Sequence, residues 1–499
     1  MLVKIYRRWF FDSNEKALLN KVEQPKTQSY SCTKDIIVIQ APADHYYLCL
    51  YGMLVANIKK GNTIGISAIY SDIFTIRPAK KIFILSSIIY FFDSLLIKRK
   101  WKKLYPAIGV DSFIAIDRAN IFQKIKYMFN AFKVWRKFKT KEQILNFSIN
   151  NIECGDLIYD TYLRYEVRPT VDIADSRLIY YIYKSYCVLN SLTKLTSTKS
   201  VKAYYSSYAT YIQHGLPVRY FLKEGIEVIT SGNLQQKFKK LSLHDYYHTA
   251  PHLTYKTVFT NLSNKDLNIQ AGKNLLNEKF AGVISQANSY MKKSVFSDTE
   301  LSLFSDTYDG VVFLHDFFDS PHIYSWMLFT DFYDWTTYTL NFIQKNDLNI
   351  AIKPHPNQTE ESRKVIEDLK MLYKNIQWID STISNSVIFK SRIKFGISVY
   401  GTVLHELAYH GKNPICAGDN PHAAFNFVHT PSSIESYEIM ILENEKLTLP
   451  VNYMDEIGSF YFMHNIYDKE DVLVSIGELK DFNVFNSDSS LIEKILLNY

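Results

Sequence analysis

The stretch GISVYGTVLHELAYHGKNPICAG, residues Gly396–Gly418, decides the fold of the second half of this chain. Its apolar beginning predicts a buried strand that ends at Ser398, and Thr402–Tyr409 predicts a helix. Gly411 ends that helix, and Asn413–Ala417 predicts the next strand. Because a strand, a helix and a second strand follow in this order, the segment indicates a parallel sheet.

The same alternation continues outward from this stretch. Val311–Leu314 and Asn349–Lys353 predict two further strands of the same series, separated by a helix. A separate series opens the chain, where Asp35–Gln40 and Thr63–Ala68 predict strands around a helix over Tyr46–Lys60. Two series of this kind predict an α/β chain with two Rossmann-like domains facing a cleft.

Polar residues accumulate from Ser285 to Gly310, and we place the domain junction there. We therefore expect an N-terminal domain over residues 1–300 and a C-terminal domain over residues 301–475. The last residues, 476–499, contain an apolar helical stretch that we expect to pack back across the junction.

The composition is that of a globular protein. Of the 499 residues, 47% are hydrophobic and 21% are charged, which excludes wholesale disorder and fibrous repeats. The net charge of +7 fits an anionic partner such as a nucleotide phosphate or an acidic membrane surface, but it is too mild for a dedicated nucleic-acid binder. Five separated cysteines without a CxxC motif indicate reduced thiols in a cytoplasmic protein.

We expect neither a signal peptide nor a transmembrane helix. The apolar stretch Ile82–Ile97 is short for a membrane span, and Asp93 interrupts it. The basic run KRKWKK (Lys98–Lys103) follows that stretch and has two interpretations. It either docks on anionic lipid at the inner face of the cytoplasmic membrane or is a solvated helix end.

Open parallel sheets bind ligands beyond the carboxyl ends of their strands, so the loops there are candidate sites. Lys353-Pro354-His355-Pro356 follows a predicted strand, and its prolines fix the backbone around His355. An imidazole beside an ammonium group suits a phosphate or a leaving nucleotide. The alternative is a loop with a chance histidine.

A second candidate follows the strand that ends at Ser398. Gly401 and Thr402 turn into a helix whose N-terminal N–H groups suit a phosphate. Thr402 either caps the helix or bonds a phosphate oxygen. Glu406, one turn later, is placed to accept hydrogen bonds from ribose or sugar hydroxyls. The alternative is an ordinary crossover.

A third candidate is HDFFDSPH, residues His315–His322, after the strand Val311–Leu314. His315, Asp319 and Ser320 are placed to position a sugar or phosphate. Their spacing matches no zinc signature, and we predict no metal site. The alternative is a turn whose polar side chains satisfy the backbone.

Three residues are candidates for a catalytic base. Asp44 and His45 lie in the loop after the first strand, where either can deprotonate a hydroxyl or simply begin the next helix. Asp309 precedes the second series and is either an acid near the cleft or part of a turn. Arg219, on a predicted helix, either reaches an anionic group or forms a surface salt bridge.

The second half resembles a family of bacterial enzymes. HDFFDSPHIYSWMLFTDFYDW (His315–Trp335), IAIKPHPNQ (Ile350–Gln358) and the stretch quoted first are similar to segments of glycosyltransferases that build capsule and lipopolysaccharide, with the two-domain glycosyltransferase-B architecture. The resemblance covers roughly Gly155 to Gly418.

The HP motif is also similar to that of sialyltransferases and 3-deoxy-manno-octulosonic acid (Kdo) transferases, which use CMP-sugars. This resemblance implies that His355 contacts the nucleotide phosphate and that Ser398 or Thr402 helps to bind it. It also implies that Asp309 supplies the base. Tyr308 stands where a second acid is often found, so Asp44 remains a rival for that role.

The resemblance and the residues together predict a glycosyltransferase. Its donor is a nucleotide-sugar, with a CMP-linked ulosonic acid such as Kdo or a sialic-acid-like sugar favoured, and its acceptor is a growing capsular or lipopolysaccharide glycan. We expect no required cofactor, no nucleic-acid partner and a glycan or lipid-linked glycan acceptor. The alternatives are a CDP-polyol-dependent polyol-phosphate transferase of the teichoic-acid type and a non-catalytic scaffold of a polysaccharide-assembly complex.

Overall fold

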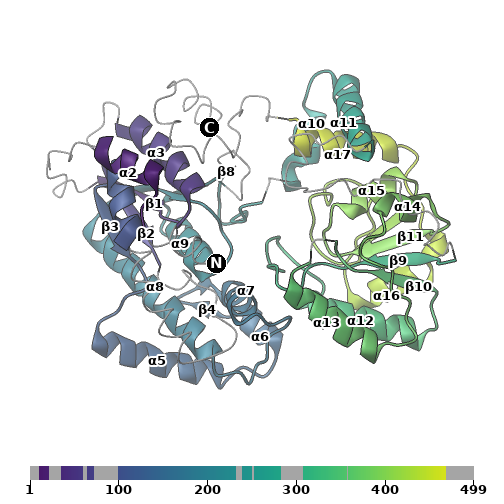
Figure 1. The fold of residues 1–499 in the computed structure, drawn as a ribbon, viewed down its shortest axis with the longest axis horizontal. Coiled ribbons are helices and arrows are strands. Elements are labelled where there is room, and N and C mark those ends of the chain that lie inside the picture. Colours follow the sequence, from purple (N-terminus) through teal and green to yellow (C-terminus); the bar gives the residue numbers. More distant parts are fainter. Residues whose placement is uncertain are drawn as a thin grey trace. The chain divides into compact units, whose positions relative to one another are not determined.

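The computed structural model describes residues 10–21, 35–59, 64–71, 99–231, 239–249, 252–281, 307–356 and 358–467 (Figure 1). These residues form two compact units. The first comprises the described residues of 10–166 and 171–248, and the second those of 167–170 and 249–467. Each unit contains one mainly parallel sheet, so the predicted α/β fold with two Rossmann-like domains is confirmed.

The sheet of the first unit has six strands in the order β3-β2-β1-β6-β7-β8. All neighbours pair in parallel except β7 and β8, which are antiparallel. The strands are β1 (Asp35–Gln40), β2 (Gly65–Tyr70), β3 (Ser112–Ala115), β6 (Ser200–Ser206), β7 (Glu227–Thr230) and β8 (Lys239–Lys240). A short antiparallel pair, β4 (Ser148–Ile149) and β5 (Ile152–Glu153), lies outside this sheet.

Helices of the first unit pack against the sheet and against one another. Helix α8 contacts α5, α7, α9 and strand β6. The helices are α2 (Ser13–Lys21), α3 (His45–Lys59), α5 (Ile121–Trp135), α6 (Lys141–Leu145), α7 (Gly155–Glu166), α8 (Leu178–Thr198) and α9 (Ile212–Lys223).

The sheet of the second unit has four parallel strands in the order β10-β9-β11-β12. They are β9 (Gly310–Phe313), β10 (Ile350–Lys353), β11 (Phe395–Ser398) and β12 (Asn413–Cys416). All sixteen residues of these strands are buried except Asn413, which is half-buried. Burial on both faces is typical of a parallel sheet covered by helices.

The helices of this unit follow the strands in the expected order. Residues Ile376–Ile379, which predict a strand, form only a single bridge between Trp378 and Ile352 at the β10 edge. The helices are α12 (Phe332–Lys345), α13 (Glu360–Leu372), α14 (Asn385–Lys390), α15 (Val403–Tyr409), α16 (Ile434–Leu442) and α17 (Tyr453–Asn465), preceded by α10 (Tyr255–Thr260) and α11 (Lys265–Phe280).

Helices α10 and α11 belong to the second unit, although the sequence places them in the N-terminal domain. Both pack on α17 (Figure 1). The approach is close, because a Cβ on Gly272 of α11 would lie 2.1 Å from the carbonyl oxygen of Gly458. The boundary drawn at residue 300 and the helix expected over 476–499 lie outside the described residues.

None of the helices in the described ranges is both long and apolar enough to cross a membrane. The apolar stretch Ile82–Ile97 lies outside those ranges. Residues 99–107 are helical and contain most of the basic run KRKWKK. Lys100 and Trp101 are buried there, so neither interpretation of the run, a lipid contact or a solvated helix end, applies to these two side chains.

Candidate functional site

The clearest candidate site lies at the carboxyl edge of the second sheet, between β9 and β11. The chain leaves β9 towards β10 on one side and then crosses to β11 and β12 on the other. Open α/β sheets bind ligands at such a point of reversal, at the carboxyl ends of the two central strands. His315 follows β9, and Ser398 ends β11.

Hydrogen bonds connect these two strand ends. His315 Nε2 lies 3.1 Å from Ser398 Oγ and accepts the backbone N–H of Tyr400 at 3.4 Å. Ser398 Oγ also lies 3.1 Å from the carbonyl oxygen of Phe313, and its single proton can be donated to only one of these two acceptors. Because a backbone N–H can only donate, Nε2 carries the lone pair and the neutral ring carries its proton on Nδ1.

The surroundings of His315 favour this neutral form. Burial lowers the pKa of His315 to about 3, and the nearby His355 acts in the same direction, while Asp316 opposes it. The imidazole stacks on Phe332 with 4.6 Å between ring centroids, and Tyr400 lies at 5.0 Å. His315 is therefore a fixed, uncharged hydrogen-bonding group.

The rest of the HDFFDSPH segment has mainly structural contacts. Ser320 is buried, and its carbonyl oxygen accepts the hydroxyl of Tyr400 at 2.9 Å. Asp319 is exposed, and its N–H bonds the carbonyl oxygen of Asp316 at 3.2 Å. The structure thus places a half-buried His315 after the carboxyl end of β9 and Asp319 at the surface.

Asp316, which the sequence reasoning did not single out, braces the neighbouring loop. One oxygen accepts the Ser362 hydroxyl at 2.7 Å, and the other accepts the N–H of Thr359 at 2.8 Å. Both partners lie at the start of α13, directly after the Lys353–Pro356 segment. Asp316 therefore joins the loops that follow β9 and β10, and its carboxylate is committed to this role.

Lys353 and His355 follow the neighbouring strand β10. The Lys353 side chain is buried, and its Nζ lies 3.4 Å from the carbonyl oxygen of Ser381. Burial lowers the pKa of Lys353 to about 8, although Asp380 opposes the shift. His355 is exposed at the rim, and partial loss of solvent together with the Lys353 ammonium lowers its pKa.

The turn between β11 and α15 passes close to His315, and Gly401 leaves room for this approach. A Cβ on Gly401 would lie 3.2 Å from Ser398 Oγ and 3.7 Å from His315 Cε1. Thr402 is exposed at the N-cap of α15, without a capping bond from its side chain to any residue that the structure describes.

Glu406 and Asp309 do not join this site. Glu406 is buried and forms an ion pair with Lys279 of α11 at 2.5 Å, so its expected role towards ribose hydroxyls is not supported. Asp309 directly precedes β9 and pairs with Lys394 at 2.9 Å. In a parallel sheet this is the edge opposite to His315, so the structure corrects the base assignment for Asp309.

The first unit has a corresponding polar network at its own point of reversal, between β1 and β6. Gln40, the last residue of β1, accepts the Ser207 hydroxyl at 2.7 Å and lies 2.5 Å from His214 Nδ1. Burial lowers the pKa of His214 to about 3. Tyr208 stacks on His248 with 3.8 Å between centroids. The sequence analysis missed Gln40 and His214, whose signal is their position at the end of β1 and in the first turn of α9.

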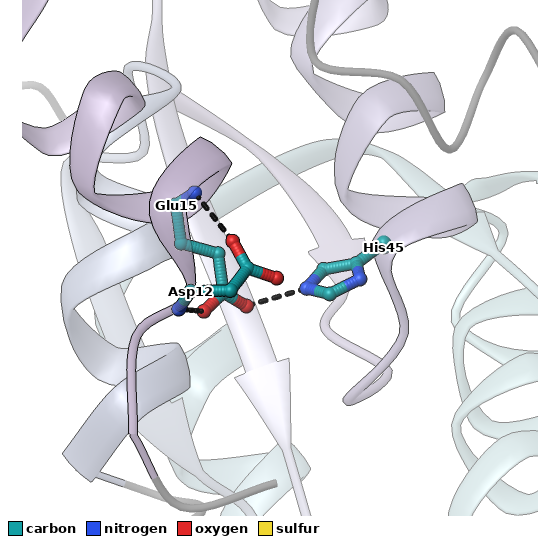
Figure 2. A group of neighbouring side chains, drawn as sticks. All are labelled: Asp12, Glu15 and His45. Atoms are coloured by element: carbon teal, nitrogen blue, oxygen red, sulfur yellow. Dashed lines mark hydrogen bonds and ion pairs between the residues drawn. The ribbon is translucent and has the colours of Figure 1, made fainter. Parts of the chain in front are cut away.

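Asp44 and His45 lie where the sequence placed them, after β1 and at the start of α3. Asp44 is exposed and accepts the N–H of Tyr46 at 2.8 Å, as the helix-start alternative requires. His45 Nε2 lies 2.5 Å from Oε1 of Glu15 on α2 (Figure 2). Lys100 Nζ lies 2.6 Å from the same buried oxygen.

Asp12, Glu15 and His45 are close enough together to be considered as metal ligands (Figure 2). Their contacts have a simpler explanation. The N–H of Asp12 and the N–H of Glu15 each bond the other residue's carboxylate, at 2.9 and 2.8 Å, as at a capped helix start. Lys100 already supplies the positive charge beside Glu15. Burial raises the pKa of Glu15, but the hydrogen bonds from His45 and Lys100 outweigh it and the pKa is lowered.

Arg219 is also committed to an internal contact. It forms a two-pronged ion pair with Asp156 of α7, with one N–O distance of 2.6 Å, and donates to the carbonyl oxygen of Glu153 at 3.0 Å. The guanidinium therefore joins α9 to α7 and β5, and its functional interpretation is wrong.

No family model matches the sequence, and no curated protein aligns with it. Three solved structures are similar at a low level. The β-Kdo 2,4 transferase KpsC of Thermosulfurimonas dismutans is 11% identical over 53% of this chain and 80% of its own, with a TM-score of 0.33. Anabaena HepE, solved with UDP and glucose, is 10% identical over 93% of this chain and all of its own, with a TM-score of 0.27.

The third structure is the UDP-GlcNAc 2-epimerase of Neisseria meningitidis bound to UDP-GlcNAc. It is 10% identical over 93% of this chain and 100% of its own, with a TM-score of 0.23. Similarity at this level does not identify an activity. The fold assignment rests on the two parallel sheets themselves.

Proposed function

We propose that this chain is a glycosyltransferase that uses a nucleotide-sugar donor. The observation that carries the proposal is the hydrogen-bonded contact between His315 and Ser398 across the point of strand reversal, beside Lys353 and His355 on the next strand. Lys353 supplies a positive charge, His315 and His355 supply imidazoles, and the carboxylate of Asp316 is used internally. Such a set of groups favours an anionic ligand at this edge.

Within this proposal, His355 contacts the nucleotide phosphate, and Lys353 stabilises the charge that develops on the leaving group. Of the two hydroxyls, Ser398 is bonded internally, so the exposed Thr402 binds a phosphate oxygen, and Gly401 allows the ligand to approach the backbone closely. His315 orients the β11–α15 turn. This arrangement needs no metal ion at the second sheet.

Asp44 and His45 remain the candidates for the base that deprotonates the acceptor hydroxyl. The structure adds a reason to prefer His45. A carboxylate at 2.5 Å can only accept, so Glu15 fixes the proton of the neutral ring on Nε2 and leaves Nδ1 as the basic nitrogen. Asp44, by contrast, already caps α3.

The favoured donor is a CMP-linked ulosonic acid, and the favoured acceptor is a capsular or lipopolysaccharide glycan. Both choices rest on the resemblance of the Lys353–Pro356 segment to the HP motif of Kdo transferases and sialyltransferases. A pair of α/β units is common to many nucleotide-sugar enzymes, so the donor must be decided by binding.

Thermal shifts with CMP, CDP, UDP, GDP and dTDP test the proposal. A ligand that binds only the folded state adds about 2.7 kcal/mol of stability at a hundredfold excess over its dissociation constant. We expect a shift with CMP that His355→Ala abolishes. His244→Ala is the matched control, because His244 is an exposed histidine of the first unit.

Each other outcome has a defined meaning. A shift with UDP, GDP or dTDP instead of CMP keeps the transferase and rejects the ulosonate donor. A shift with CDP alone favours polyol-phosphate transfer. No shift with any nucleotide, with folding intact, contradicts the proposal and favours a scaffold.

A further inference from the structure

Helix α5 (Ile121–Trp135) exposes an unusually apolar face. Six large apolar side chains on it are between 40% and 80% exposed: Ile121, Phe122, Ile125, Met128, Phe129 and Phe132. At about 100° per residue they form one stripe roughly 120° wide. Isolated exposed apolar residues are ordinary on protein surfaces, but a continuous stripe of this kind marks an interaction site.

The opposite face of α5 is firmly anchored, so the stripe has a fixed orientation. Tyr127 stacks on Tyr186 of α8 with 5.7 Å between centroids, and its hydroxyl donates to Asn190 at 2.9 Å. Trp135 Nε1 donates to the carbonyl oxygen of Ile173 at 2.9 Å, and Ala131 is buried. Figure 1 shows α5 on the outside of this unit, beside α8.

The start of α5 is also well defined. Asn120 Oδ1 accepts the N–H of Gln123 at 2.9 Å, and Gln123 Oε1 accepts the N–H of Asn120 at 3.1 Å. This capping box fixes the first turn. Ile121 and Phe122, the two most N-terminal members of the stripe, are therefore held in helical geometry rather than at a frayed end.

The charges beside the stripe are all positive. Residues 121–137 contain four lysines and one arginine but no Asp or Glu: Lys124, Lys126, Lys133, Arg136 and Lys137. Lys133 Nζ lies 4.2 Å from the ring centroid of Phe129, and the Arg136 guanidinium lies 5.8 Å from that of Phe132. Lys126 and Lys133 border one side of the stripe in the helical projection, and Lys124 borders the other.

We propose that α5 docks on an anionic lipid bilayer, with its axis in the plane of the surface. The apolar stripe enters the boundary between headgroups and acyl chains, and the lysines on either side bind lipid phosphates. The long lysine side chains suit this position, because their aliphatic stems can cover apolar surface while the ammonium groups remain in the headgroup layer. We infer an anionic bilayer as the partner from charge complementarity, because cations border the stripe on both sides. The inference does not depend on the proposed transferase activity.

Vesicle sedimentation of the full chain tests this surface. We expect wild type to bind vesicles of phosphatidylcholine with phosphatidylglycerol at least tenfold more tightly than vesicles of phosphatidylcholine alone, and less tightly as salt is raised. Phe122→Gln/Phe129→Gln should lower binding to the anionic vesicles at least tenfold. Lys126→Gln/Lys133→Gln should lower it several-fold and reduce its dependence on salt.

Met371→Gln/Leu372→Gln is the matched control, because it replaces two exposed apolar side chains of α13 in the other unit. It should leave vesicle binding unchanged, and circular dichroism should show all variants folded. The proposal is overturned if wild type does not bind anionic vesicles, or if the α5 variants bind them as wild type does. It is also overturned if sedimentation velocity without vesicles shows a dimer that Phe122→Gln/Phe129→Gln dissociates while vesicle binding persists.

Discussion

Glu406 of α15 and Lys279 of α11 form an ion pair in the interior of the second unit, with 2.5 Å between Oε1 and Nζ. Both side chains are buried. The pair joins the helix after β11 to a helix that the sequence analysis assigned to the other domain. It accounts for a buried carboxylate at position 406 without a role in ligand binding.

Removing one partner of this pair should destabilise the second unit strongly. Lys279→Met leaves the Glu406 carboxylate buried without its counter-ion, and we expect a loss of about 3–5 kcal/mol. Lys279→Met/Glu406→Met removes both charges and should lose less. Urea unfolding of the three proteins measures the difference. If Glu406→Gln instead preserved stability and lowered nucleotide affinity, that result would support the ribose contact expected from the sequence.

Lys353 should make stability depend on pH above neutrality. Its pKa falls from 10.5 in an unfolded chain to about 8 in the folded protein. Below pH 8 both states carry the proton, and burial of the ammonium opposes folding. Between pH 8 and 10.5 the unfolded state binds more protons, so stability contributed at this site rises with pH.

The shift in the pKa of Lys353 corresponds to an effect on the order of 3 kcal/mol. Lys353→Met should therefore be more stable than wild type at pH 7, and the difference should shrink as the pH approaches 10.5. The free energy of unfolding in urea is measured for both proteins across this pH range. Taking the difference between the two proteins removes the contribution of the tyrosines, which both contain. A difference independent of pH would show that Lys353 keeps an ordinary pKa.

Binding of an anionic nucleotide should couple to proton uptake at the same lysine. At pH 9 the folded protein holds Lys353 largely neutral, and a phosphate nearby favours the ammonium form. Calorimetry with CMP at pH 9 in two buffers of different ionisation enthalpy should reveal uptake of a fraction of a proton, absent at pH 7. Lys353→Met should bind without uptake at either pH. Uptake that persisted in the variant would assign it to another group.

His315 should stay neutral, with its proton on Nδ1, throughout the physiological range. This follows from the pKa of about 3 for His315 and from the Tyr400 N–H that Nε2 accepts. Nitrogen NMR of the protein labelled at histidine should show a ring in the Nδ1–H form among those that do not titrate between pH 5 and 8. The signal should vanish in His315→Gln. If the ring whose signal vanishes in His315→Gln titrated near pH 6.5, that would contradict the hydrogen bonding described here.

The sequence predicted strands well where apolar runs are short and flanked by clear ends. Asp35–Gln40 matches β1 to the residue, and Asn413–Ala417 extends one residue beyond β12. Helix α12 begins at Phe332, because Asp331 caps it by accepting the N–H of Asp334. Residues Ile376–Ile379 have the composition of a strand, but they form a bridge to only one residue of the edge strand β10.

The candidate site was predictable only in part, for a physical reason. The loops after strands follow from local pattern, so His315, Lys353 and Ser398 were found. The partners of Glu406 and His45 were not, because Lys279 and Glu15 are distant in sequence and each contact depends on how helices pack. Parallel pairing also decides which loops share the carboxyl edge of the sheet, and it separates Asp309 from His315.

Glu15 should control the chemistry of His45 if His45 is the base of the proposed transfer. His45→Gln should lower kcat by about 10²-fold or more with little change in KM, the usual contribution of a general base. Glu15→Gln can keep a hydrogen bond to the ring but no longer requires the proton on Nε2, and it should lower kcat by roughly tenfold. Nitrogen NMR separates this effect from simple misfolding, because wild type should show His45 with its proton on Nε2 and Glu15→Gln a mixture of the two forms. His244→Ala is the matched control, with unchanged kcat. If Glu15→Gln alters the NMR signal but neither variant alters kcat, while CMP still binds, then Glu15 orients His45 for a structural purpose and Asp44 becomes the base to test next.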